Sequence, residues 1–143
     1  MDKAIKCGKL FETTDGSVSE NKVILIKDDR IEAVVNLSEF NDENYEVIDL
    51  SDKFVMPGLV ECHVHISEFG ASETFKTNAT QLIGDGTLIG LKNAQTQLMA
   101  GFTTLRNAGS PGFLDVSLKN AINKGLFCGP RIVASGSCIG STG

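Results

Sequence analysis

The chain has 143 residues, of which 41% are hydrophobic and 22% charged, and these proportions are typical of a globular protein rather than a disordered one. Its formal net charge of −5 gives no electrostatic basis for binding nucleic acid or an anionic membrane. The length is enough for one ordinary domain or for two small units.

Targeting signals and cysteine spacing indicate the compartment. The N-terminal residues lack the apolar run of a signal peptide, and no segment is apolar over the length that a bilayer requires. The four cysteines, Cys7, Cys62, Cys128 and Cys138, form no C-x-x-C pair and are interpreted as free thiols in a reducing compartment. Cys62 is expected to be a small buried side chain. These features predict a cytoplasmic protein with no membrane partner.

The first part of the chain, residues 1–55, has the pattern of short β-strands separated by turns. A mixed apolar segment at 4–11 is followed by a turn at Asp15-Gly16. The apolar runs 23–26 and 31–35 flank Asp28-Asp29 and predict a hairpin, with Asp29 able to take the left-handed conformation. A further strand is expected at 46–50. This part is too small and too strand-rich to bury a core unaided.

The second part, residues 56–143, has the pattern of parallel βα units. Helical spacing over 87–100 is followed by Leu88, Leu91, Ala94 or Gln95, and Leu98, and Gly101 supplies the C-cap. A strand over 102–108, a helix whose stripe includes Leu114 and Leu118, and a strand over 131–135 complete the alternation. The polar segment 67–84 gives no assignment. A complete (β/α)8 barrel takes about 250 residues, so the sequence predicts an incomplete one.

The segment with the clearest chemistry is the strand that contains Glu61, His63 and His65. Side chains alternate along a strand, so these three are expected to share one face. Ionisable groups are costly to bury in a parallel strand unless they have a partner, and two converging imidazoles suit a divalent metal such as zinc, manganese, iron or nickel. The alternative is a half-exposed strand with two solvated histidines.

Three ordered motifs give a resemblance to a known family. Val55-Met56-Pro57-Gly58-Leu59-Val60-Glu61-Cys62-His63-Val64-His65 resembles the first barrel strand of the amidohydrolase superfamily, Pro-Gly-Leu-Ile-Asp-x-His-x-His. The segment 101–109, Gly-Phe-Thr-Thr-Leu-Arg-Asn-Ala-Gly, resembles the family's Gly-x-Thr-Thr-x-Arg-Asp-x-Gly, and 129–136 resembles its Gly-Pro-Arg segment. The combination most resembles the imidazolonepropionase-like and Xaa-Pro dipeptidase (prolidase-like) branch.

The resemblance implies a fold. It is α/β, with a small N-terminal β-sandwich portion in residues 1–55 followed by the first βα units of an incomplete TIM (β/α)8 barrel. Residues 56–143 would hold the first three strands and two helices of that barrel, as an N-terminal fragment of the enzyme.

The resemblance also implies a metal site and residues around it. His63 and His65 match the pair that binds the more buried metal, with zinc as the first expectation. Glu61, where the motif usually has Asp, would orient a histidine. Arg106 would contact substrate or form an ion pair in the barrel wall, and Asn107 replaces an Asp found in many relatives. The chain has 2 histidines in all, so the remaining ligands and the catalytic residues cannot be assigned in it.

The implied reaction is hydrolysis of a carbon–nitrogen bond in a small-molecule amide, dipeptide or lactam, by a water that the metal activates. With two ligands only, the chain alone is expected to be inactive. Its open sheet edges predict self-association. The alternatives are a non-catalytic binding or assembly module built on the remnant of the fold, and a simple two-histidine metal-binding protein. The substrate-determining loops of the later βα units are not in the sequence.

Overall fold

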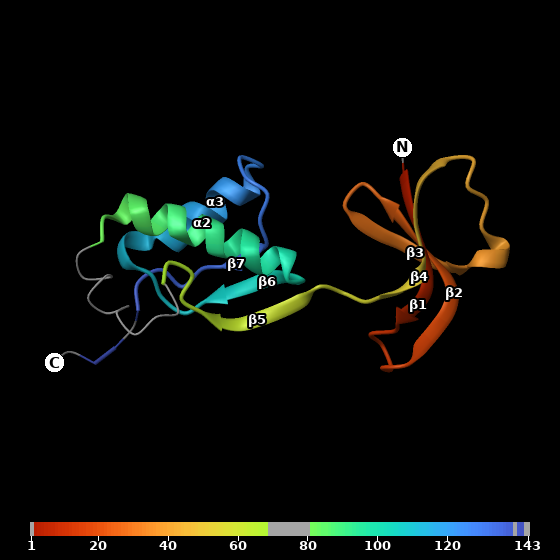
Figure 1. The fold of residues 1–143 in the computed structure, drawn as a ribbon, viewed down its shortest axis with the longest axis horizontal. Helices are drawn as coiled ribbons and strands as arrows, with labels where there is room; N and C mark the ends of the chain where they lie inside the picture. Colours follow the sequence, from red (N-terminus) through yellow and green to blue (C-terminus); the bar gives the residue numbers. More distant parts are fainter. Residues whose placement is uncertain (1, 69–80, 139, 142–143) are drawn as a thin grey trace. The chain divides into compact units, whose positions relative to one another are not determined.

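The computed structural model describes residues 2–68, 81–138 and 140–141, so most of the polar segment 67–84 lies outside the described residues. The chain divides into two compact units, Met1–Pro57 and Gly58–Gly143 (Figure 1). The division falls slightly after the boundary expected at residue 55. Among the described residues, no helix has both the length and the apolar character needed to cross a membrane.

The N-terminal unit is a four-stranded sheet in the order β3-β2-β1-β4. Its strands are β1 (Asp2–Phe11), β2 (Val18–Lys27), β3 (Arg30–Asn36) and β4 (Tyr45–Val55), with a 3-10 turn at Leu37–Glu39. Neighbours β1 and β2 and neighbours β2 and β3 are antiparallel, whereas β4 returns parallel to β1. The expected hairpin is present, but Asp28 rather than Asp29 takes the left-handed conformation, at φ 54°.

The main apolar cluster of the N-terminal unit lies on one face of this sheet. Cys7, Leu10 and Ile24 are buried there, with Ile5, Ile26 and Val55 packed against them. Burial raises the pKa of the Cys7 thiol, because the thiolate form would lose its hydration. Cys7 therefore behaves as a small apolar side chain, whereas Cys62, Cys128 and Cys138 are exposed free thiols.

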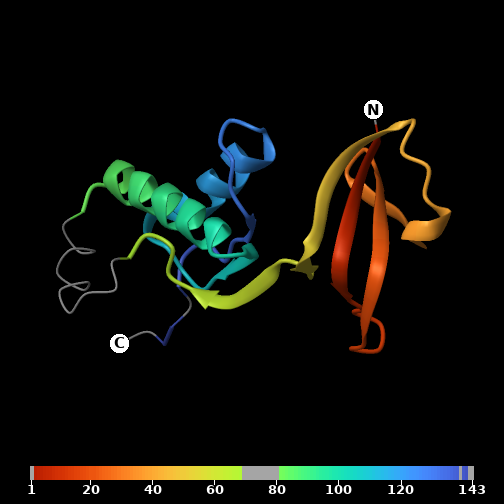
Figure 2. The same cartoon turned by 45° about the vertical axis from the view of Figure 1, so that its right-hand side comes forward.

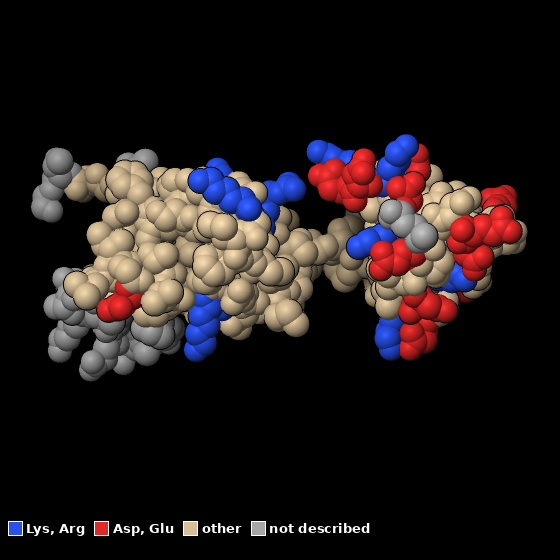
Figure 3. Space-filling model, turned by 90° about the horizontal axis from the view of Figure 1, so that it is seen from above, with Lys and Arg blue, Asp and Glu red and all other residues tan. Residues whose placement is uncertain are grey.

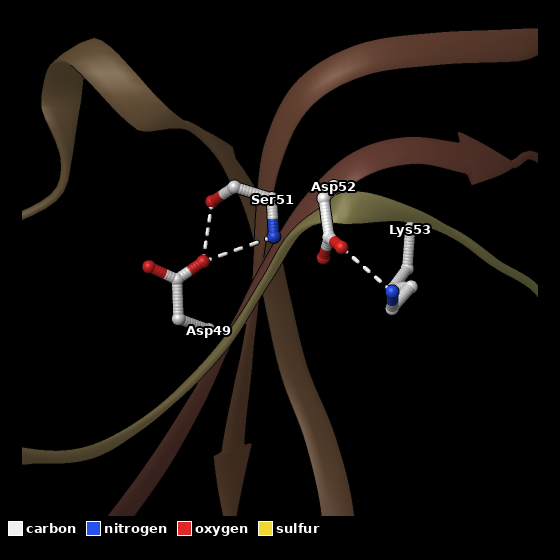
Figure 4. Close-up of polar contacts among 4 residues, drawn as sticks. All are labelled: Asp49, Ser51, Asp52 and Lys53. Carbon is white, nitrogen blue, oxygen red and sulfur yellow. Dashed lines mark hydrogen bonds and ion pairs between the residues drawn. The ribbon is translucent and has the colours of Figure 1, made fainter.

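An irregularity in β4 interrupts its pairing with β1. Cys7 pairs with Leu50 and Lys9 with Phe54, so residues 51–53 bulge opposite Gly8. Asp49 Oδ1 accepts hydrogen bonds from the Ser51 backbone N–H (2.9 Å) and the Ser51 hydroxyl (2.5 Å), and these fold the bulge back on the strand (Figure 4). A Cβ at position 8 would lie 2.3 Å from the Ser51 carbonyl oxygen, so the bulge requires glycine there.

We expect Ser51→Ala to raise the pKa of Asp49 toward its ordinary value. The Ser51 hydroxyl is the first cause of the lowered pKa and the Ser51 N–H is the second. A lowered pKa in the folded state contributes stability that is present above the unfolded pKa, about 3.9, and is lost as the pH falls through the folded pKa. Carboxyl NMR titration of Asp49 checks this, with exposed Asp52, which pairs with Lys53 in Figure 4, as the internal reference. An Asp49 pKa unchanged in the variant would contradict it.

The second unit consists of parallel βα elements, as the sequence predicts. It contains β5 (Leu59–Val64), α2 (Ile83–Met99), β6 (Phe102–Asn107), a 3-10 turn (Pro111–Phe113), α3 (Leu114–Asn123) and β7 (Arg131–Val133). The strands pair in the order β5-β6-β7, both pairs parallel. Figures 1 and 2 show α2 and α3 lying on the same face of this sheet. The arrangement is that of the first βα units of an incomplete barrel.

The core of the second unit lies between the sheet and the two helices. Ile66, Ala94, Leu105, Leu114, Leu118 and Ile132 are buried there. The stripe expected on α2 is confirmed at Leu91 and Ala94, but Leu88 is 69% exposed, and Gly86 and Gly90 are buried in its place. A Cβ at position 90 would lie 2.8 Å from Leu118 Cδ1, so glycine lets α3 approach α2 closely.

Charged side chains are unevenly distributed between the units. Figure 3 shows most of the visible Asp, Glu, Lys and Arg atoms on the N-terminal unit and few on the second unit. Most of the acidic residues of the chain fall within residues 1–57. The visible face has no extended basic stripe of the kind that follows a nucleic-acid backbone.

Candidate metal centre

The two histidines lie at the carboxyl end of β5. His63 is the penultimate residue of that strand and is exposed, and His65 follows directly after the strand and is half-buried. Their ring centroids are 5.3 Å apart, with the ring planes at 69° to each other. This end of a parallel βα sheet is the one at which barrel enzymes place their active sites. The structure thus brings the two rings together at this end of β5.

A β-bulge separates the two histidines from the regular part of β5. Glu61 pairs with Leu105 and Val64 pairs with Asn107, so β5 carries one residue more than β6 between these pairs. A bulge bends a strand and changes the direction of its side chains. The simple alternation that predicts Glu61, His63 and His65 on one face is thus interrupted between Glu61 and His63.

Two side chains hold the peptide bond between Cys62 and His63 within this bulge. Arg106 Nη1 donates to the Cys62 carbonyl at 3.0 Å, and the His63 backbone N–H donates to Glu61 Oε1 at 3.1 Å. Glu61, expected to orient a histidine, and Arg106, expected to contact substrate or to form an ion pair, therefore both contact the backbone of the His-x-His segment. They satisfy polar groups that the broken pairing leaves without a strand partner.

Asn107 is fully buried and joins the end of β6 to its surroundings. Its Oδ1 accepts from the Ile66 backbone N–H (2.9 Å), and its Nδ2 donates to Ser110 Oγ (2.9 Å) and to Asp115 Oδ2 (3.0 Å). A carboxylate accepts hydrogen bonds and cannot donate one. The amide that replaces the family's more usual Asp thus gives Asp115 a donor that an ionised Asp could not provide.

Asp115 is the residue of this site that the sequence analysis missed. It is 0% exposed in the first turn of α3, and its carboxylate accepts from Asn107 and from the backbone N–H groups of Val116, Ser135 and Gly136. The only signal in the sequence is an acidic residue within the apolar run Phe113-Leu114-Asp115-Val116. That pattern is also typical of an exposed acidic residue that complements a helix dipole.

The donor set of the histidine pair fits a transition metal. His65 Nδ1 lies 3.3 Å from the Gly109 carbonyl oxygen, an acceptor, so this contact favours the tautomer that is protonated on Nδ1 and leaves the Nε2 lone pair for a metal. Neutral imidazole suits zinc, manganese, iron or nickel. In the part of the chain that the structure describes, no cluster of three or more His, Cys, Asp or Glu side chains is present.

The expected burial of Cys62 is wrong, because this thiol is exposed. Its strand, β5, is an edge strand of the three-stranded sheet, and α2 and α3 pack on other residues of the described unit. An exposed thiol between two histidines is itself a candidate metal ligand once deprotonated. Experiments on metal binding by this segment therefore have to control for it.

Comparison with known proteins agrees with this geometry. A profile of the Amidohydrolase family matches residues 54–142. A dihydroorotase of Ligilactobacillus salivarius (strain UCC118) is 39% identical over 82 residues, which are 55% of this chain and 18% of that protein.

Solved structures resemble both parts of the chain. A Xaa-Pro dipeptidase with methionine bound in its active site aligns with a TM-score of 0.83 and 30% identity over 97% of this chain and 34% of its own. A prolidase in complex with N-methylphosphonate-L-proline aligns with the same TM-score and 32% identity, over 95% of this chain and 32% of its own. The chain thus spans about a third of these structures' length, and it belongs to the amidohydrolase family, with structural neighbours that are prolidase-like.

Proposed function

We propose that this chain supplies the first two metal ligands, His63 and His65, of a metal-dependent amidohydrolase that cleaves carbon–nitrogen bonds. The observation that carries the proposal is the pair of imidazole rings 5.3 Å apart at the carboxyl end of a parallel strand, in a chain of this family. A bound divalent metal would supply an activated water and would polarise the substrate carbonyl. Zinc is the first choice because two imidazoles at one site are typical zinc ligands.

The residues around the pair support a role in holding it. Arg106 and Glu61 bind the peptide bond before His63, and the Gly109 carbonyl favours the His65 tautomer that is protonated on Nδ1. Within the described residues only these two histidines converge, whereas a catalytic zinc takes three protein ligands as a rule. The proposal therefore assigns half of a site to this chain and leaves the other ligands to the rest of the barrel.

The proposal extends to the substrate class and to the arrangement of the chain. The relatives are a dihydroorotase and prolidase-like enzymes, so small-molecule amides, dipeptides and lactams are the proposed substrates. Residues 1–55 would form part of the composite β-sandwich, and residues 56–143 the first three strands and two helices of the barrel. The outer edges of β5 and β7 are unpaired in the described sheet, which supports self-association of the chain.

Zinc titration tests the assignment. We expect the wild-type chain to take up zinc and the double variant His63→Ala/His65→Ala to bind it at least about 100-fold more weakly, since even the loss of a residue that only orients a ligand costs roughly 10–100-fold. Isothermal titration calorimetry, or competition with a chromogenic chelator, measures the difference.

The control for this titration is the exposed thiol between the two ligands. The comparison is made in a Cys62→Ser background, so that a thiolate cannot substitute for a lost imidazole. Equal zinc uptake with and without the two histidines in that background would overturn the proposed site.

A further inference from the structure

A buried polar cluster lies directly behind the histidine pair. Asp115 and Asn107 are both 0% exposed, and the carboxylate receives four donors without any cation among them. Burying a carboxylate is costly, and an apolar core in its place would be simpler. A buried polar cluster is therefore expected to do what an apolar side chain cannot, which is to hold neighbouring groups in place by directed hydrogen bonds.

The cluster ties together the segments that follow all three barrel strands. Asn107 binds Ile66, just after β5, and Ser110, just after β6, and Asp115 binds Ser135 and Gly136, just after β7. These segments begin the loops on the active-site face. One amide–carboxylate pair therefore fixes the relative positions of three loop origins.

The segment 108–110 lies between the cluster and His65. The Ala108 N–H donates to the Val64 carbonyl (2.8 Å), the Ser110 N–H donates to the Gly136 carbonyl (2.8 Å), and Asn107 Nδ2 holds the Ser110 hydroxyl. Gly109 is fixed between these bonds at φ 145°, and a Cβ there would lie 2.1 Å from Cys138 Sγ. Its carbonyl oxygen therefore has a defined position, 3.3 Å from His65 Nδ1.

We propose that the buried Asn107–Asp115 pair is a positioning device for the metal centre: it holds the segment 108–110 so that the Gly109 carbonyl keeps the His65 proton on Nδ1 and leaves Nε2 free for the metal. Both residues act through Gly109 and touch neither metal nor substrate. The inference rests on the proposed function, because positioning His65 matters only if His65 binds a metal. The His65 tautomer that the Asn107–Asp115 pair favours is nevertheless a property of the metal-free chain.

Nitrogen NMR of the imidazole rings tests it without metal, because ring 15N chemical shifts distinguish a protonated nitrogen from a bare one. In the wild-type chain His65 should be protonated on Nδ1. In Asn107→Ala the Nε2-protonated form should become populated, and the affinity for zinc should fall roughly 10–100-fold, as for other groups that orient a metal-bound histidine. Asp115→Asn keeps one acceptor oxygen, so it should retain more of the Nδ1-protonated form than Asp115→Ala.

Leu118→Ala is the matched control for a general loss of packing. It opens a cavity beside Gly90 in the same unit but leaves the hydrogen bonds of Asn107 and Asp115 in place. His65 should keep its Nδ1-protonated form in this variant. If Asn107→Ala changes neither tautomer nor affinity, or if Leu118→Ala changes the tautomer equally, the inference is wrong. A wild-type chain that shows the expected tautomer but takes up no zinc would refute the proposed function and leave the positioning of His65 standing.

Discussion

Asp115→Ala should destabilise the second unit by about 3–5 kcal/mol. The change removes the common acceptor of Asn107 Nδ2 and of the Val116, Ser135 and Gly136 N–H groups. Each buried donor that loses its partner costs about 1–3 kcal/mol, and water entering the space left by the carboxylate recovers part of the total. A loss of this size is comparable to removing one partner of a buried ion pair.

The matched control is Asp85→Ala. Asp85 also lies in the first turn of a helix, α2, but it is exposed, so its loss should cost at most about 1 kcal/mol through the helix dipole. Hydrogen exchange of the β6 amides follows the stability of the second unit separately from that of the N-terminal sheet. If the two variants lost equal stability, the four hydrogen bonds to Asp115 would contribute no more than a surface charge.

The sequence predicts the elements that local patterns determine. The hairpin around Asp28 and the alternation of β5, α2, β6, α3 and β7 follow from spacing of two or 3.6 residues and from turn residues. The Pro-Gly-Leu and Gly-Pro-Arg segments resemble the family closely enough to identify it, and the profile match over residues 54–142 confirms that.

The buried face of α2 differs from the prediction at Leu88, because the pattern rule counts large apolar residues, whereas Leu91 packs against the core and Ala94 is buried as the spacing predicts. Leu88 fits the helical stripe, yet Gly86 and Gly90 face the core in its place, since α3 approaches too closely for a larger side chain. A stripe of small residues carries little hydrophobic signal in a sequence, although it determines the distance between two helices. Close packing of the two helices therefore explains why Gly86 and Gly90, and not Leu88, are buried on α2.

The geometry of the site depends on long-range contacts that no local pattern reveals. The bulge after Glu61 is defined by pairing with β6, about 40 residues later in the chain. Arg106 reaches the Cys62 carbonyl and Asn107 reaches the Ile66 amide across the same separation. The sequence could name Glu61, Arg106 and Asn107 as candidates by resemblance, but only the fold shows that each of them binds backbone of the His-x-His segment or the residues beside it.

We expect the isolated 143-residue chain to show no hydrolysis of X-Pro dipeptides, N-acyl amino acids or imidazolone-type lactams above a control with zinc or manganese alone. Its 2 histidines are both assigned to the metal, and a metal held by two imidazoles is bound loosely. Glu61 is the candidate general base on β5, and its carboxylate already accepts a hydrogen bond from the His63 N–H. In such barrels the loops of the later βα units orient the substrate, and these 143 residues span about a third of the structural neighbours' length.

The expected loss of activity is large because the positioning of reactants supplies a large part of an enzyme's rate enhancement. Well-oriented reactants reach effective molarities of about 10⁵–10⁸ M, which corresponds to roughly 7–11 kcal/mol of the activation barrier. A site that holds the metal by two ligands loses most of this reduction in the barrier. Assays with each substrate class at saturating metal, in the wild type and in His63→Ala, give the measurement. Turnover that disappears in His63→Ala would contradict the prediction. Since two histidines cannot complete a catalytic zinc site, such turnover would require a second chain to supply the missing ligands across the open edges of β5 or β7.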